Sequence, residues 1–149
     1  MKDTFYSSLL LLLLSALLIF SSCRREDRVI LGAWQLREMY TMPADTNVAP
    51  DTLQPEQEEV YIFSPDGTYT LDKIVERQGD EDLVIMRGSW EMTTVQENDQ
   101  DRSMLRLREK QLNRVVEKSY QIERLAEDTL IWNDRRRLRY FFSRVEDNN

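Results

Sequence analysis

Alternation of apolar and polar side chains with a period of two residues constrains this chain more than any other feature. It recurs from residue 32 to residue 142 in short runs that turn-forming residues separate, and helical stripes are scarce. Successive side chains of a strand point to opposite faces, so each run predicts a strand with one buried face. About eight runs at intervals of about 8–15 residues predict an all-β sandwich or barrel. A barrel is favoured because it leaves no strand edge exposed.

Turn signals mark the boundaries between these runs. Residues 64–67 read Ser-Pro-Asp-Gly, in which proline presets the second turn position and Asp-Gly suits the later ones, so they predict a hairpin. Three of the four prolines lie in residues 41–57, which predicts a long loop. Residues 103–117 fit either a helical stripe or two strands joined near residues 110–113, and we interpret them as strands.

Large aromatic side chains occupy the predicted inner faces. The first run should place Trp34, Leu36 and Tyr40 on one face, and Gly88 inside a later run predicts a bulge or a sharp bend. An eight-stranded barrel either fills its interior with side chains or holds one small ligand. Large aromatic residues in a short chain favour the filled core. If a ligand cavity exists instead, its candidate binding residues are Trp34, Trp90, Tyr120, Tyr140 and Phe142.

The first 23 residues differ from the rest of the chain. Lys2 is followed by an apolar block of 12 residues, Leu9 to Phe20, then by two serines and Cys23, the single cysteine. A helix that spans a membrane takes about 20 residues, so the block is short for a span and has the form of a secretory signal. A retained N-terminal anchor with an incidental cysteine is the alternative.

The Ser-Ser-Cys ending resembles a bacterial lipoprotein signal, in which the cysteine thiol receives a diacylglycerol and becomes the first mature residue. This resemblance implies a signal peptide over residues 1–22, a lipidated tether over residues 23–28 and a folded domain over residues 29–149. The partner of Cys23 would then be a membrane, because two acyl chains anchor a protein stably. Arg24 stands where an Asp would retain such lipoproteins at the inner membrane, so the expected location is the cell envelope and its outer membrane.

Four segments occur in a suggestive order. They are residues 32–36 (Gly-Ala-Trp-Gln-Leu), 63–69 (Phe-Ser-Pro-Asp-Gly-Thr-Tyr), 88–90 (Gly-Ser-Trp) and 120–132, which begin Tyr-Gln-Ile and end Asp-Thr-Leu-Ile-Trp. This order resembles the lipocalin-like domain lipoproteins of the Bacteroidetes, over nearly the whole chain after the signal. The resemblance implies a small eight-stranded up-and-down antiparallel barrel. It also implies that Trp34 closes the barrel base beneath an arginine from near the last strand, either Arg139 or Arg144.

Composition argues against catalysis and against a metal centre. The chain has no histidine and one cysteine, which removes the usual general base and the usual zinc ligands. A carboxylate-based hydrolase would need two facing carboxylates, and no such pair stands out. The formal net charge of −7 argues against nucleic acid as a partner. We therefore expect no enzyme, no cofactor and no metal.

Residues 135–139, Arg-Arg-Arg-Leu-Arg, form the main basic cluster after the tether. They could bind an anion or a partner, but alternation favours outward side chains that pair with carboxylates across strands.

The expected function is that of a non-enzymatic, lipid-anchored envelope protein whose barrel binds a small apolar ligand. The alternative is an interaction module, such as an accessory subunit or inhibitor of an envelope complex, that uses strand edges and the loop over residues 41–57. Exposed apolar surface inside the barrel mouth would favour the ligand, and apolar surface on an outer face would favour the partner.

Replacing Cys23 by alanine should release the protein from membranes, because the thiol is the expected site of lipid attachment. Cell fractionation followed by immunoblotting measures the effect, and Ser22→Ala, which keeps a small residue before the cysteine, is the matched control. Unchanged membrane retention of Cys23→Ala would refute the anchor.

Overall fold

The computed structural model describes residues 25–44, 47–77, 80–112 and 114–145. The predictions for the signal peptide and for Cys23 lie outside these residues. Within them, no helix has both the length and the apolar character needed to cross a membrane.

One short helix precedes a chain of strands. The helix is α2 (Arg25–Val29). The strands are β1 (Gly32–Thr41), β2 (Thr52–Leu53), β3 (Glu59–Phe63), β4 (Thr68–Arg77), β5 (Asp80–Glu97), β6 (Gln100–Gln111), β7 (Arg114–Leu125), β8 (Thr129–Asn133) and β9 (Leu138–Arg144).

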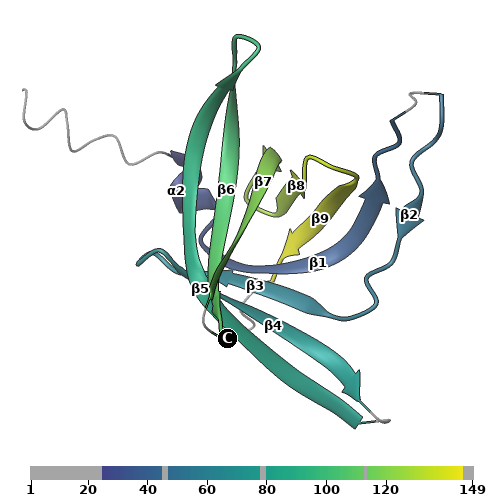
Figure 1. The fold of residues 1–149 in the computed structure, drawn as a ribbon, viewed down its shortest axis with the longest axis vertical. Coiled ribbons are helices and arrows are strands. Elements are labelled where there is room, and N and C mark those ends of the chain that lie inside the picture. Colours follow the sequence, from purple (N-terminus) through teal and green to yellow (C-terminus); the bar gives the residue numbers. More distant parts are fainter. Residues whose placement is uncertain (1–24, 45–46, 78–79, 113, 146–149) are drawn as a thin grey trace, which may run out of the picture.

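The strands form a closed antiparallel barrel. From β3 to β9 each strand pairs with the next along the chain, and β1 pairs with both β3 and β9, so the sheet closes on itself (Figure 1). The short strand β2 adds to β1 outside the eight-stranded ring, by pairing Met39 with Leu53 and Tyr40 with Thr52. The predicted eight-stranded up-and-down barrel is confirmed, and the predicted loop over residues 41–57 contains this extra strand.

Short turns connect several of the strands. Residues 103–111 belong to β6 and residues 114–117 to β7, and the two strands pair up to Gln111 and Arg114, so the strand interpretation is confirmed. β5 and β6 are joined by Asn98 and Asp99, whose φ angles of 51° and 59° are those of a two-residue hairpin turn. The turn at residues 64–67 forms as predicted, with Gly67 N donating to Ser64 O at 3.2 Å.

The prediction that Tyr40 faces inward is wrong. The pairing of β1 with β9 shifts register between Leu36 and Glu38, so one extra residue is inserted in β1. Beyond this shift Met39 packs against the core, and the Tyr40 hydroxyl donates to the carboxylate of Glu38 instead. A bulge inverts the faces of every later residue in its strand, which alternation alone does not reveal.

Gly88 does not mark a bulge. β5 changes direction near its middle (Figure 1), but its pairing with β4 and β6 runs through Gly88 without a register shift. A Cβ atom at this position would lie 2.2 Å from the carbonyl oxygen of Arg108 and 2.6 Å from Cε1 of Tyr69. Glycine is therefore needed because the Tyr69 ring and a neighbouring strand approach the backbone closely.

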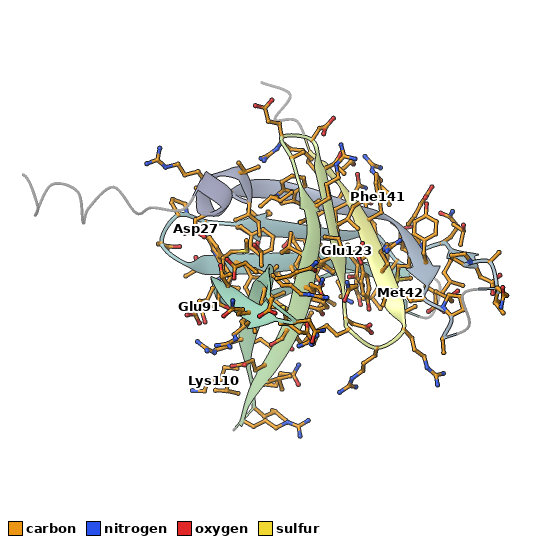
Figure 2. The ribbon with its side chains drawn as sticks, turned by 90° about the horizontal axis from the view of Figure 1, so that it is seen from above. Asp27, Met42, Glu91, Lys110, Glu123 and Phe141 are labelled. Atoms are coloured by element: carbon orange, nitrogen blue, oxygen red, sulfur yellow. The ribbon has the colours of Figure 1, made fainter. Side chains whose placement is uncertain are left out.

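Charged side chains of the outer surface form cross-strand ion pairs, such as that between Glu91 of β5, labelled in Figure 2, and Arg108 of β6 at 3.4 Å. Within the basic cluster, Arg135 Nη2 lies 3.0 Å from Glu97, and Arg139 Nε lies 2.7 Å from Glu123. The predicted pairing of this cluster with carboxylates is confirmed for these two arginines.

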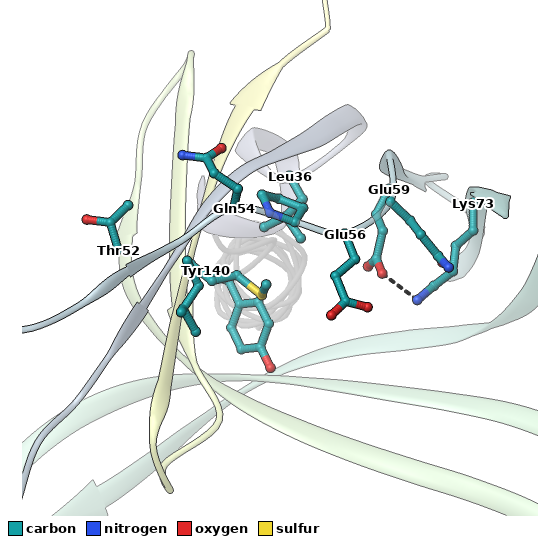
Figure 3. Close-up of a pocket in the computed structure, with 11 residues that line it drawn as sticks. Leu36, Thr52, Gln54, Glu56, Glu59, Lys73 and Tyr140 are labelled. Carbon is teal, nitrogen blue, oxygen red and sulfur yellow. Dashed lines mark hydrogen bonds and ion pairs between the residues drawn. The ribbon is translucent and has the colours of Figure 1, made fainter. Parts of the chain in front are cut away.

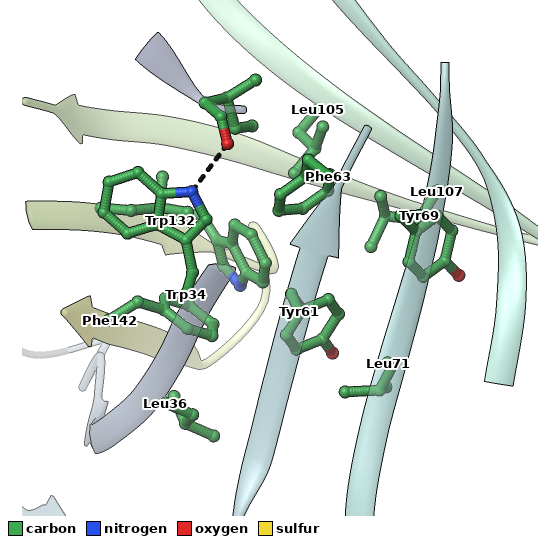
Figure 4. Packing of buried hydrophobic residues seen from close by; sticks show 12 residues of the cluster. Trp34, Leu36, Tyr61, Phe63, Tyr69, Leu71, Leu105, Leu107, Trp132 and Phe142 are labelled. Carbon is green, nitrogen blue, oxygen red and sulfur yellow. Dashed lines mark hydrogen bonds between the residues drawn. The ribbon is translucent and has the colours of Figure 1, made fainter. Parts of the chain in front are cut away.

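The buried core gathers at one end of the barrel, which we call the closed end. Its fully buried side chains include Trp34, whose Nε1 donates to Ile30 O at 2.7 Å (Figure 4). The guanidinium carbon of Arg144 lies 4.3 Å from the ring centroid of Trp34. Of the two arginines that the resemblance allowed, Arg144 is therefore the one that covers the indole.

Arg144 also binds the chain that enters the barrel. Its Nη1 and Nη2 donate to the carbonyl oxygens of Leu31 and Val29 at 2.7 and 2.6 Å, and its Nε donates to Glu127 O. Gly32 makes room for it, because a Cβ atom there would lie 2.8 Å from Arg144 Nη1, and the φ of Gly32 is 106°. The positive φ favours glycine two residues before Trp34, and the missing Cβ leaves room for the guanidinium group.

Replacing Arg144 by methionine should lower the free energy of unfolding by about 3 kcal/mol, since it removes a cation–π contact and leaves three carbonyl groups without their charged donor. Denaturant unfolding followed by tryptophan fluorescence measures the change. Arg137→Met, at an exposed position in the turn between β8 and β9, is the matched control. Equal effects of the two substitutions would contradict this role of Arg144.

Candidate ligand-binding site

The barrel interior changes in polarity from its closed end to its opposite, open end. β3 runs from Glu59 at the open end through Tyr61 to Phe63, and the facing residues of β4 are Lys73, Leu71 and Tyr69. Directly opposed residues of an antiparallel pair point to the same face. Because Tyr61, Phe63, Tyr69 and Leu71 are all buried, this face is the interior, and Glu59 and Lys73 complete it at the rim.

Four tyrosines from four strands form a belt inside the barrel. We define the tyrosine belt as Tyr61 of β3, Tyr69 of β4, Tyr120 of β7 and Tyr140 of β9. The ring centroids of Tyr61 and Tyr69 lie 6.4 Å apart, and those of Tyr120 and Tyr140 lie 6.0 Å apart. Trp132 joins the two pairs, because its ring lies 5.3 Å from Tyr61 and 4.9 Å from Tyr120. Figure 4 shows Tyr61, Tyr69 and Trp132 around the core.

All four belt phenols resist ionisation. Burial is the main cause, and it raises the pKa of Tyr69 to about 12 with a further contribution from the carboxylate of Glu109. Burial also raises the pKa of Tyr61, Tyr120 and Tyr140, and the carboxylate of Glu59 adds to the effect on all three. Neighbouring phenols raise the pKa of Tyr61 and Tyr120 further. At neutral pH each belt residue therefore carries an uncharged hydroxyl that can both donate and accept a hydrogen bond.

A cavity of about 510 Å³ opens at the end of the barrel away from Trp34 (Figure 3). Its inner wall includes Leu36, Met39 and Tyr140, and its outer wall is the segment of residues 52–57 at the end of the predicted loop. Glu59 and Lys73 form an ion pair at its rim. The cavity therefore has an apolar inner wall, a hydroxyl group and a polar edge.

A second opening of about 470 Å³ lies where β5 and β6 separate. The pairing of these strands begins at Gly88 and Glu109, and Ile85, Arg87 and Lys110 line the gap beyond it. Glu109 is only 5% exposed, and its carboxylate accepts a hydrogen bond from Gln111. This carboxylate therefore belongs to the barrel interior, near Tyr69.

No metal site emerges in the part of the chain that the structure describes. There, no three His, Cys, Asp or Glu side chains lie close enough together to hold a metal ion.

The predicted ligand-binding residues separate into two groups. Trp34 and Phe142 are fully buried at the closed end, and Trp90 is partly buried, with Nε1 donating to Ser64 O at 3.0 Å. Tyr120 and Tyr140 belong to the tyrosine belt, and Tyr140 lines the open-end cavity. Their contact with a ligand stays a prediction.

Four interior residues beyond the predicted ones belong to the site. Tyr61 and Tyr69 alternate with buried residues of a predicted hairpin, so the period of two could have found them. Met39 could not be predicted to face inward because of the bulge in β1. Glu59 has no sequence signal that distinguishes it from other charged residues at strand ends.

Solved structures with this fold are known. A lipocalin-like protein from Bacteroides uniformis aligns with a TM-score of 0.51 at 13% sequence identity, over 78% of this chain and 99% of that chain. An uncharacterized protein from Bacteroides eggerthii aligns with a TM-score of 0.47 at 14% identity, over 77% and 98% of the two chains. No protein-family model and no curated protein sequence matches the chain. The chain has the lipocalin-like fold.

Alkaline pH should destabilise the barrel through the tyrosine belt. The pKa of Tyr69 is about 12 in the folded chain, whereas that of an unfolded tyrosine is about 10, so unfolding releases a proton between these values. The free energy of unfolding should be constant up to about pH 9 and then fall between about pH 10 and 12. Urea unfolding at stepped pH measures the fall, which Tyr69→Phe should reduce. An unchanged fall in that variant would contradict the assignment.

Proposed function

We propose that this lipocalin-like barrel is a non-enzymatic binding protein that holds a small, largely apolar ligand at its open end. The open-end cavity is the observation that carries the proposal. Its volume of about 510 Å³ lies within the range of about 300–1,000 Å³ that is usual for small-molecule sites. Leu36 and Met39 supply its apolar wall, and the aromatic interior continues beneath it.

The geometry suits attachment to a membrane through the closed end. We propose that Cys23 carries the lipid and that the protein resides in the cell envelope, at the outer membrane. α2 begins two residues after Cys23. At the closed end, Arg144 binds the carbonyl groups of Val29, the last residue of this helix, and of Leu31. A lipid on Cys23 would therefore hold the barrel by its closed end and leave the open-end cavity accessible.

A patch of exposed aliphatic side chains favours a second candidate function, that of an interaction module in an envelope complex. Leu83 and Ile85 of β5 are 62% and 49% exposed, and Leu112 and Val115 of the β6–β7 hairpin are 95% and 68% exposed. Ile85 of β5 and Lys110 of the β6–β7 hairpin line the same gap, so the exposed side chains of β5 lie near those of the hairpin. Apolar patches of this kind are typical of surfaces that bind another protein.

Replacing Met39 by tryptophan should abolish ligand binding, because the larger side chain fills the open-end cavity. The protein is incubated with a cell-envelope extract, and native mass spectrometry detects any bound small molecule. Wild-type protein should carry a bound species that Met39→Trp lacks.

Val95→Trp is the matched control, since Val95 is exposed on β5 outside the cavity. A wild-type spectrum without bound species, or an equal amount on Met39→Trp, would count against the ligand. A protein from the same extract that Met39→Trp retains and Leu83→Glu loses would favour the interaction module.

A further inference from the structure

The tyrosine belt presents hydrogen-bonding groups that nothing in the described residues uses. The hydroxyls of Tyr61, Tyr69, Tyr120 and Tyr140 form no hydrogen bond to another described residue, whereas the Tyr40 hydroxyl, outside the barrel, is bonded to Glu38. Four such hydroxyls on one interior surface are therefore available to water or to a ligand.

These hydroxyls border open space. Among the described residues, the side-chain polar atoms that are both shielded from solvent and without a partner belong to Asp27, Thr93 and Trp132. The belt hydroxyls are not among them, so their oxygens face space that solvent can enter. Tyr140 also lines the open-end cavity, which connects the belt to the proposed binding site.

Trp132 packs against the belt tyrosines from a fully buried position. Its side chain is 1% exposed, and its Nε1 has no hydrogen-bond partner in the described residues. Its ring stacks on Tyr120 with an interplanar angle of 26° and stands perpendicular to Tyr61 at 90°. Tyr140, which is partly exposed and lines the open-end cavity, offers an aromatic face on which a ring can stack.

We propose that the ligand is a neutral, oxygen-bearing ring compound, hydroxylated or carbonyl-bearing, whose oxygens bond to the tyrosine belt. This inference rests on the proposed function and specifies its ligand class. A plain hydrocarbon or acyl chain would displace water from four hydroxyls and leave them unpaired, which costs affinity. An anionic ligand would meet the carboxylates of Glu59 and Glu109, and Lys73 is already paired with Glu59.

Two probes with the same carbon skeleton test the proposal, namely trans-stilbene and 3,5,4′-trihydroxystilbene. The full chain is purified from membranes and reconstituted in phospholipid vesicles, and protein-free vesicles provide the correction for partition into lipid. All three tryptophans of the chain lie in the barrel, so quenching of their fluorescence reports binding. The trihydroxy probe should bind at least about tenfold more tightly than stilbene.

Tyrosine-to-phenylalanine substitutions then identify the groups responsible. The double variant Tyr120→Phe/Tyr140→Phe should lose the preference for the trihydroxy probe and keep its affinity for stilbene, which also shows that the barrel remains folded. Tyr40→Phe makes the same chemical change outside the barrel and should keep the preference.

Equal binding of the two probes to the wild-type chain, or a preference that survives in the double variant, would overturn the ligand class and leave the proposed function standing. Binding of neither probe would count against the proposed function and the ligand class together.

Discussion

The guanidinium group of Arg144 connects the end of the last strand to the start of the first strand. It stacks on Trp34 of the first strand and binds the carbonyl groups of Val29 and Leu31, although it lies at the end of the last strand. Closure of the sheet between β1 and β9 brings these groups together, and Gly32 leaves the space that the guanidinium occupies. The closed end of the barrel is therefore filled by these side chains, so any ligand must bind toward the open end.

Closure at one end explains the gradient along the interior. Trp34 and Phe142 fill the closed end, the tyrosine belt follows, and the ion pair between Glu59 and Lys73 stands at the rim. A barrel of this size can be packed throughout or can hold one small molecule. In this barrel, aromatic residues fill the closed end, while the hydroxyls of the belt tyrosines and a cavity remain available at the open end.

Much of the fold could be predicted from alternation and turn signals, because both are local. The hairpin at residues 64–67 and the strands over residues 103–117 were predicted from neighbouring residues alone. That Met39 and not Tyr40 faces inward could not be predicted in this way, because it depends on a bulge that forms only when β1 pairs with β9. The close approach that requires Gly88 could not be predicted either, since the ring of Tyr69 and the backbone of Arg108 come from other strands.

The sequence by itself determined that this chain would form short strands packed as a sandwich or a barrel, since the period of two residues and the turns are properties of short segments. The up-and-down barrel was implied only by the resemblance of four segments to lipocalin-like domains. The sequence also excludes histidine as a general base, because the chain has none. Only the tertiary structure decided between Arg139 and Arg144 and brought four tyrosines from four strands into one belt. Those relations join residues far apart in the chain, and closure of the sheet sets their distances.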